Sequence, residues 1–166
     1  MASEQTREKF FSFPDPVNEV SARLVAGGVV VLCLVAIIAQ LPWLTLLIAL
    51  GFLARVLTGP KLSPLGLFVT RWLTPRLDLE ARYVPGPPKR FAQGIGLAFS
   101  TTAAVLALGI GLDGAAYVVL GLLAAAATLE SVFGLCLGCK MFALLMRAGL
   151  VPQDVCERCA DINLAR

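Results

Sequence analysis

Four of the five cysteines form two pairs with identical spacing, Cys136-Leu-Gly-Cys139 and Cys156-Glu-Arg-Cys159. Two residues between cysteines is a spacing used both by zinc sites and by thiol–disulfide active sites. Two such pairs close together in a short chain form a specific pattern. The pattern predicts a site built from thiols and leaves its chemistry open.

Zinc binding is one chemistry that this spacing allows. Four thiolates complete the tetrahedral shell of Zn²⁺. A chain that folds back after Gly149 could bring Cys156 and Cys159 to Cys136 and Cys139. A site of this kind would be structural, and the protein would be a non-enzymatic membrane scaffold.

Thiol redox or persulfide chemistry is the alternative that we favour. Paired cysteines in a reducing compartment are more often catalytic, sensing or metal-bound than disulfide-linked. Cys136 and Cys139 would be the redox pair, and Cys156 and Cys159 the resolving pair. We expect the first pair late in a helix, where the helix dipole does not favour a thiolate. Four inert thiols remain a further alternative, and we interpret Cys33 as a small apolar core residue.

Glu130 is the other residue that could carry chemistry, because it interrupts an apolar run. A carboxylate at membrane depth is costly unless it has a partner or is protonated. It could relay protons to the thiols, or line the path of a small transporter. We favour a structural role, in which its partner is Lys89 or Arg90, or a hydroxyl such as Ser100 or Thr101.

The expected helix also bears on whether Glu130 meets the thiols. Successive residues of a helix are about 100° apart, which places Glu130 off the face of Cys136 and nearly opposite Cys139. We therefore expect no direct contact between the carboxylate and the cysteine pair.

The elements that position these residues are predicted to be membrane-spanning helices. Hydrophobic residues make up 58% of the chain and charged residues 15%, with a mean hydropathy of +0.82. Soluble domains carry about 25% charged residues. No charged residue lies between Arg23 and Arg55, and only Asp113 lies between Phe91 and Leu129. These two stretches predict an all-α polytopic membrane protein.

Four transmembrane helices account for the two stretches. The first stretch is too long for one crossing of a bilayer whose hydrocarbon core is about 30 Å thick. Its middle, Gln40-Leu41-Pro42-Trp43, predicts a tight helical hairpin, with one kinked helix as the alternative. The expected spans are about 20–39, 43–57, 91–112 and 115–139, and the last helix could continue to about Ala148.

The flanking segments complete the predicted organisation. Residues 1–19 form a polar N-terminal arm, 20–148 the transmembrane bundle, and 149–166 a cysteine-containing helical tail. Residues between Pro64 and Pro75 suit a short amphipathic interfacial helix. Basic residues dominate the segment from Arg55 to Arg90. By the positive-inside rule, this segment and the C-terminus are cytoplasmic, in a multi-pass protein of the cell membrane.

Three motifs resemble a known family. They are Gly-Pro-Lys-Leu-Ser-Pro-Leu-Gly (59–66), Gly-Pro-Pro-Lys-Arg-Phe-Ala (86–92) and Leu-Glu-x4-Leu-Cys-Leu-Gly-Cys-Lys (129–140). The set resembles a bacterial, mainly actinobacterial, integral-membrane family catalogued as a domain of unknown function (number forty-three ninety-five). The resemblance implies thioredoxin-like or rhodanese-like soluble partners, and it is associated with Cys136 and Cys139 rather than with the second pair.

The sequence therefore predicts a membrane-embedded partner in thiol redox or sulfur transfer. A zinc scaffold and a small transporter that uses Glu130 stay open as alternatives. The net charge of +3 comes from basic residues that flank apolar spans. Since these residues do not form a basic stripe, no nucleic-acid partner is expected.

Overall fold

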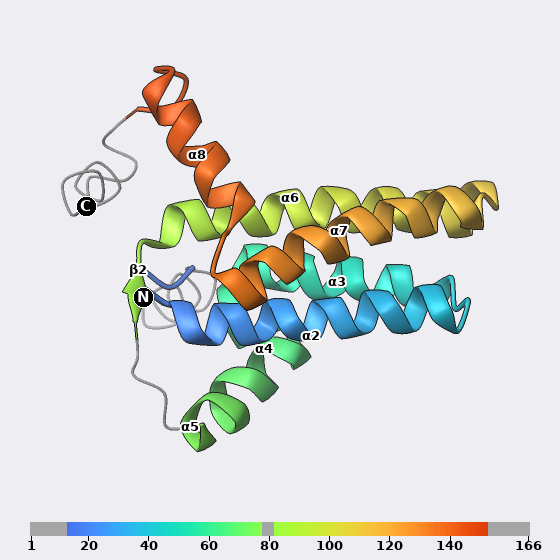
Figure 1. Ribbon diagram of the computed structural model, residues 1–166, viewed down its shortest axis with the longest axis horizontal. Coiled ribbons are helices and arrows are strands. Elements are labelled where there is room, and N and C mark those ends of the chain that lie inside the picture. The colour runs from blue at the N-terminus through green and yellow to red at the C-terminus, as the bar shows by residue number, and fades with distance from the viewer. Residues whose placement is uncertain (1–12, 78–81, 153–166) are drawn as a thin grey trace, which may run out of the picture.

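The computed structural model describes residues 13–77 and 82–152 and is an all-α bundle (Figure 1). Among the described residues, four helical segments are long and apolar enough to cross a membrane: Glu19–Ile38, Trp43–Arg76, Gly86–Ile110 and Asp113–Phe133. The predicted fold class, a polytopic bundle with four potential spans, is confirmed. Residues 1–12 of the predicted arm and 153–166 of the predicted helical tail, with Cys156 and Cys159, lie outside the described residues.

The first two helices form the predicted hairpin. Helix α2 (Glu19–Ile38) begins where the Asn18 side chain accepts a hydrogen bond from the Val20 N–H at 3.0 Å. It ends before Gln40, whose φ of 50° is left-handed, and α3 (Trp43–Thr58) starts immediately after Pro42. Proline fits this first-turn position because it lacks the N–H that a helix start leaves unpaired.

The second pair of long helices runs in the same antiparallel way (Figure 1). Helix α6 (Gly86–Ala104) continues as the π-helical segment η3 (Val105–Ile110), and α7 (Asp113–Phe133) returns after Gly111, whose φ is 76°. Helix α2 packs mainly on α7, and α3 packs mainly on α6. Cys33 is fully buried in the core that the four helices share, as predicted.

A run of short helical pieces connects the two pairs at one end of the bundle. It contains the 3₁₀ turn η1 (Gly59–Lys61), α4 (Pro64–Phe68), the π-helical segment η2 (Val69–Leu73) and α5 (Thr74–Arg76). Phe68 and Trp72 are exposed, and the Arg76 guanidinium stacks 3.5 Å from the centre of the Trp72 ring. A short helical segment with exposed aromatic and basic side chains agrees with the predicted amphipathic helix; its place at a membrane surface stays a prediction.

A small antiparallel ribbon ties the starts of α2 and α6 together. Strand β1 (Val17–Asn18) pairs with β2 (Tyr83–Val84), and Val17 lies opposite Val84. The ribbon continues through a hydrogen bond from the Glu19 N–H to the Arg82 carbonyl at 2.7 Å. The sequence interpretation did not include this ribbon, because two-residue strands leave no readable alternation.

The last predicted helix is wrong in one respect: it is broken. Helix α7 ends at Phe133, and a separate helix, α8 (Leu137–Arg147), leaves the bundle at an angle (Figure 1). The physical reason is Gly134, whose φ of 67° no α-helix can accommodate. The N–H groups of Gly134 and Leu135 donate back to the carbonyls of Glu130 and Leu129 and close α7.

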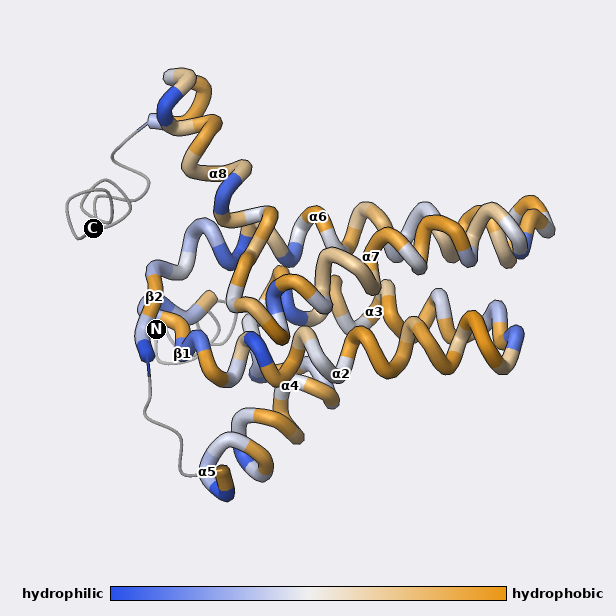
Figure 2. Tube along the Cα trace, in the orientation of Figure 1, coloured by the Kyte–Doolittle hydropathy of each residue, from blue (hydrophilic) through white to orange (hydrophobic). Residues whose placement is uncertain are grey.

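Apolar and polar residues are divided along the bundle axis. Large hydrophobic side chains stay exposed along all four long helices, among them Val31, Leu50, Leu108 and Val118. Hydrophilic residues gather at the end where β1, β2 and α8 lie (Figure 2). We call this end the basic end; the opposite end holds the turns at Gln40 and Gly111. The distribution is typical of a surface whose middle faces lipid.

Candidate functional site

The first cysteine pair lies at the start of a helix. Cys136 is the N-cap residue of α8, with extended backbone at φ −83° and ψ 104°, and Cys139 stands in the first turn. The prediction that both would lie late in a helix is therefore wrong. Because the N-terminus of a helix favours negative charge, the expected effect of the helix dipole is reversed. Here the dipole supports a thiolate.

The two thiols shift each other's pKa in opposite directions. A hydrogen bond from the Cys139 side chain lowers the pKa of Cys136, and the same bond raises the pKa of Cys139. Burial and the Glu130 carboxylate oppose the lowering at Cys136, while the Lys89 ammonium supports it. Cys136 is therefore the thiol that ionises first, and Cys139 keeps its proton.

Glu130 has the structural partner that the sequence suggested. Lys89 Nζ lies 2.6 Å from Glu130 Oε1, and the two side chains are 7% and 15% exposed. Two of the other suggested partners are engaged elsewhere: Arg90 donates to the Val56 carbonyl, and Ser100 to carbonyls of its own helix. The pair joins α6 to α7 close to the point where α7 ends.

Glu130 and Cys136 share a cavity, and the expectation of no direct contact between the carboxylate and the thiols stays a prediction. Both residues line a cavity of about 200 Å³, together with Arg55 and Gln93. The expectation assumed one straight helix, but the turn at Gly134 changes the direction of the chain between the two residues. The Lys89–Glu130 pair and Cys136 therefore belong to one site.

A second cavity, of about 280 Å³, gives access to the thiols. Cys136, Cys139 and Lys140 line it from the side of α8, and Lys89 and Pro88 from the side of α6. Cys136 is 7% exposed, and Cys139 is half-buried. A reactant that enters here meets a thiol pair with a lysine on each side.

A close approach of two helices holds α8 in place. A Cβ added to Gly138 would lie 2.6 Å from the Ala92 Cα, so a side chain does not fit here without movement. Farther along α8, Phe142 packs on Phe91 with ring centroids 5.6 Å apart. The glycine inside the Cys136-Leu-Gly-Cys139 motif therefore allows α8 to pack directly on α6.

Replacing Gly138 with alanine is expected to move α8 away from α6. Overpacking of this kind costs about 1–3 kcal/mol. We expect the free energy of unfolding to fall by that amount, and Cys136 to be alkylated faster. Gly94→Ala is the matched control, since a Cβ at this α6 position meets nothing within 4 Å. Equal effects of the two substitutions would contradict the role of Gly138 in this packing.

Arg23 stabilises the end of α7 beside the site. Its Nη2 donates to the Val132 carbonyl at 2.8 Å and its Nε to the Ser131 carbonyl at 3.2 Å. Carbonyls at a helix C-terminus lack partners within the helix and carry partial negative charge, which a guanidinium satisfies. Helix α2 thereby fixes the point at which the chain leaves α7 for α8.

The described residues supply half of the predicted four-cysteine zinc site. No group of three or more metal-ligating side chains occurs within residues 13–77 and 82–152. Cys136 and Cys139 are present as two neighbouring thiols. Cys156 and Cys159 lie beyond the described part of the chain, so the four-cysteine arrangement stays a prediction.

Two basic residues contribute more than the sequence interpretation gave them. The sequence suggested Lys89 as a partner of Glu130 and gave Arg55 no role beyond the basic segment, but both side chains are buried, at 6% and 5% exposure. For Arg55 a signal was present: the residue lies in the last turn of its expected helix, two residues before the expected end at Leu57, where a basic side chain must cross apolar neighbours. For Lys89 the signal was Glu130, whose carboxylate at membrane depth needs a partner.

Comparison with known proteins gives one match. The model of a family described as Domain of unknown function (DUF4395) matches residues 17–147. The matched range includes all four long helices and α8 with Cys136 and Cys139. No curated protein and no solved structure matches the sequence.

Proposed function

Because the chain belongs to the family described as Domain of unknown function (DUF4395), we propose its function from the site itself. The proposed function is that of a membrane-embedded partner in thiol redox or sulfur transfer. Cys136 is the nucleophile and Cys139 the resolving thiol. The observation that carries the proposal is the position of the pair at the start of α8, where the helix N-terminus favours a thiolate.

Thiol–disulfide exchange at this pair takes two steps. The Cys136 thiolate attacks one sulfur of a partner disulfide, forms a mixed disulfide and releases the other partner sulfur as a thiolate. Cys139 then loses its proton and attacks Cys136 Sγ, which frees the second partner sulfur. Two electrons pass from the Cys136–Cys139 dithiol to the partner, and the reverse sequence oxidises a partner dithiol.

Sulfur transfer uses the same nucleophile. The Cys136 thiolate attacks the outer sulfur of a partner persulfide, and the partner leaves as a thiolate. Cys136 then carries the persulfide, with no net oxidation. Its neighbours Lys89 and Lys140 line the same cavity, and their positive charge favours the Cys136 thiolate and the partner thiolate that leaves.

The proposed partner is a soluble thioredoxin-like or rhodanese-like protein that docks on the basic end. The segments from η2 to the start of α6 and the start of α8 carry basic residues, among them Arg71, Arg76, Arg82, Arg90 and Lys140. By the positive-inside rule we propose that this end is cytoplasmic, in a multi-pass protein of the cell membrane whose C-terminus is also cytoplasmic. Cys156 and Cys159 would receive the reducing equivalents from the first pair and pass them on.

A redox titration of the purified protein tests the proposal. In a Cys156→Ser/Cys159→Ser chain, a water-soluble disulfide is expected to convert Cys136 and Cys139 into one intramolecular disulfide, and dithiothreitol to restore both thiols. Alkylation followed by mass spectrometry counts the thiols, while Cys33 stays buried as an internal reference. Failure to form the disulfide would overturn the proposal. One zinc per wild-type chain, lost in Cys139→Ser, would assign the scaffold function instead.

A further inference from the structure

Arg55 is a buried cation whose hydrogen-bonding groups are partly unused. The side chain lies in the last turn of α3 and is 5% exposed. Neither its Nε nor its Nη1 has a hydrogen-bond acceptor. The face of the Phe52 ring, 4.2 Å from the guanidinium carbon, is the contact that it makes. An arginine buried in this way needs an opposite charge to offset the loss of hydration.

No described acidic residue forms an ion pair with Arg55, although the Glu130 carboxylate is near enough to attract it. Glu130 is paired with Lys89, and Glu19 with Arg82. Asp15 accepts a hydrogen bond from the Gly86 N–H, and Asp113 lies at the opposite end of the bundle. Within residues 13–77 and 82–152, two buried cations therefore share one buried carboxylate.

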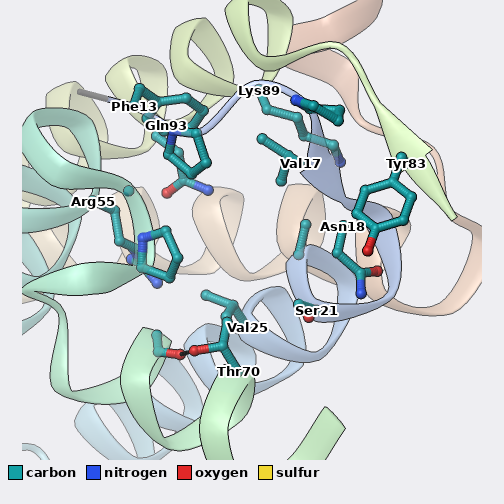
Figure 3. A pocket seen from close by; sticks show the side chains of 16 residues that line it. Phe13, Val17, Asn18, Ser21, Val25, Arg55, Thr70, Tyr83, Lys89 and Gln93 are labelled. Atoms are coloured by element: carbon teal, nitrogen blue, oxygen red, sulfur yellow. Dashed lines mark hydrogen bonds between the residues drawn. The ribbon is translucent and has the colours of Figure 1, made fainter. Parts of the chain in front are cut away.

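A cavity lies in front of the unused groups. It has a volume of about 250 Å³, and Arg55, Gln93 and Lys89 face it from α3 and α6 (Figure 3). The Gln93 Oε1 is also buried without a partner. Rotating the side-chain amide so that its nitrogen and oxygen exchange places would present an N–H to the same space. The other walls are largely apolar, with contributions from Phe13, Pro14, Val17 and Val25.

We propose that this cavity binds an oxoanion of the phosphate or sulfate type, held by the Arg55 guanidinium. The planar fork of a guanidinium matches two oxygens of such a group, and the attraction is strong where water is excluded. Gln93 adds a neutral donor, and the ammonium of Lys89, which is paired with Glu130, also lines the cavity. The ligand chemistry is shared by a free inorganic oxoanion and by the phosphate of a lipid headgroup. The proposal does not depend on the thiol chemistry at Cys136.

The first arm of the test uses inorganic anions. Lipid-free protein in a neutral maltoside detergent is unfolded thermally in sodium sulfate or phosphate and in sodium chloride of equal ionic strength. Sulfate also stabilises proteins by exclusion from their surface, so the wild type must be compared with variants. We expect the oxoanions to raise the melting temperature of the wild type and of Arg71→Gln, an exposed control at the same end. Arg55→Gln should show only the smaller shift due to exclusion.

The second arm tests the lipid headgroup. Native mass spectrometry counts molecules of a short-chain phosphatidylglycerol bound per chain, in wild type, Arg71→Gln and Arg55→Gln. Binding that is lost only in Arg55→Gln supports the proposal and identifies the headgroup as the source. Should Arg55→Gln fail to fold, Arg55→Lys keeps the charge without the fork and should weaken binding about tenfold. Absence of binding in both arms, or binding that persists in both Arg55 variants, would overturn the proposal.

Discussion

Replacing Lys89 with methionine is expected to lower the free energy of unfolding by about 3–5 kcal/mol. The substitution leaves the Glu130 carboxylate buried at 15% exposure with its ammonium partner removed. A carboxylate inside a membrane bundle cannot recover that interaction from bulk water. Reversible unfolding in mixed micelles, followed by the intensity of tryptophan fluorescence, measures the change.

Two further variants separate the buried pair from a general effect of charge removal. Lys89→Met combined with Glu130→Leu removes both charges and should recover most of the lost stability, because neither member of the pair is left buried without its partner. Arg82→Met breaks the Glu19–Arg82 pair, in which the Arg82 side chain is 81% exposed. That exposed pair should cost at most about 1 kcal/mol. Equal costs for Lys89→Met and Arg82→Met would contradict the structural role of the Lys89–Glu130 pair.

Replacing Cys139 with serine is expected to trap the thiol partner. Cys136 keeps its helix N-terminus and a hydroxyl donor at position 139, but the mixed disulfide loses the thiol that resolves it. In a Cys156→Ser/Cys159→Ser background, a covalent complex with a thioredoxin-like protein should accumulate and should disappear on reduction. Non-reducing electrophoresis and mass spectrometry of the crosslinked cysteine check this result.

The matched variant is Cys136→Ser in the same background. It removes the thiol that ionises first and leaves Cys139, whose pKa is raised, so we expect no complex. Trapping by Cys139→Ser should also begin at a lower pH than for an ordinary thiol. The reason is that the lowered pKa of Cys136 supplies thiolate there. Equal trapping by both variants would contradict the assignment of nucleophile and resolving thiol.

The sequence predicts the bundle well because its signals are local. Two stretches, one without charge and one nearly so, indicate four helices. The sequence Gln40-Leu41-Pro42 indicates the hairpin in the first stretch. The break at Gly134 has no comparable local signal, since Gly121 stays helical within the same apolar run. The break is stabilised by distant residues: Arg23 binds the carbonyls at the end of α7, and Gly138 lets α8 approach Ala92.

The candidate site was only partly predictable for the same reason. The types and spacing of Cys136 and Cys139 are visible in the sequence, and so is the cost of burying Glu130. Their placement depends on the break, which turns the end of a supposed long helix into the beginning of a short one. The burial of Arg55 and Lys89 depends on how α3, α6 and α7 pack, which a single chain without aligned relatives does not reveal.

Both ends of the described chain lie at the end of the bundle that holds the thiols (Figure 1). The cause is the even number of long helices, which returns the chain to its starting side. A soluble domain joined to either terminus through a flexible linker would therefore meet Cys136 without crossing the membrane. Short flexible tethers give effective concentrations in the millimolar range, far above those of most freely diffusing proteins. With such a fusion, the exchange that we propose at Cys136 would become an intramolecular reaction.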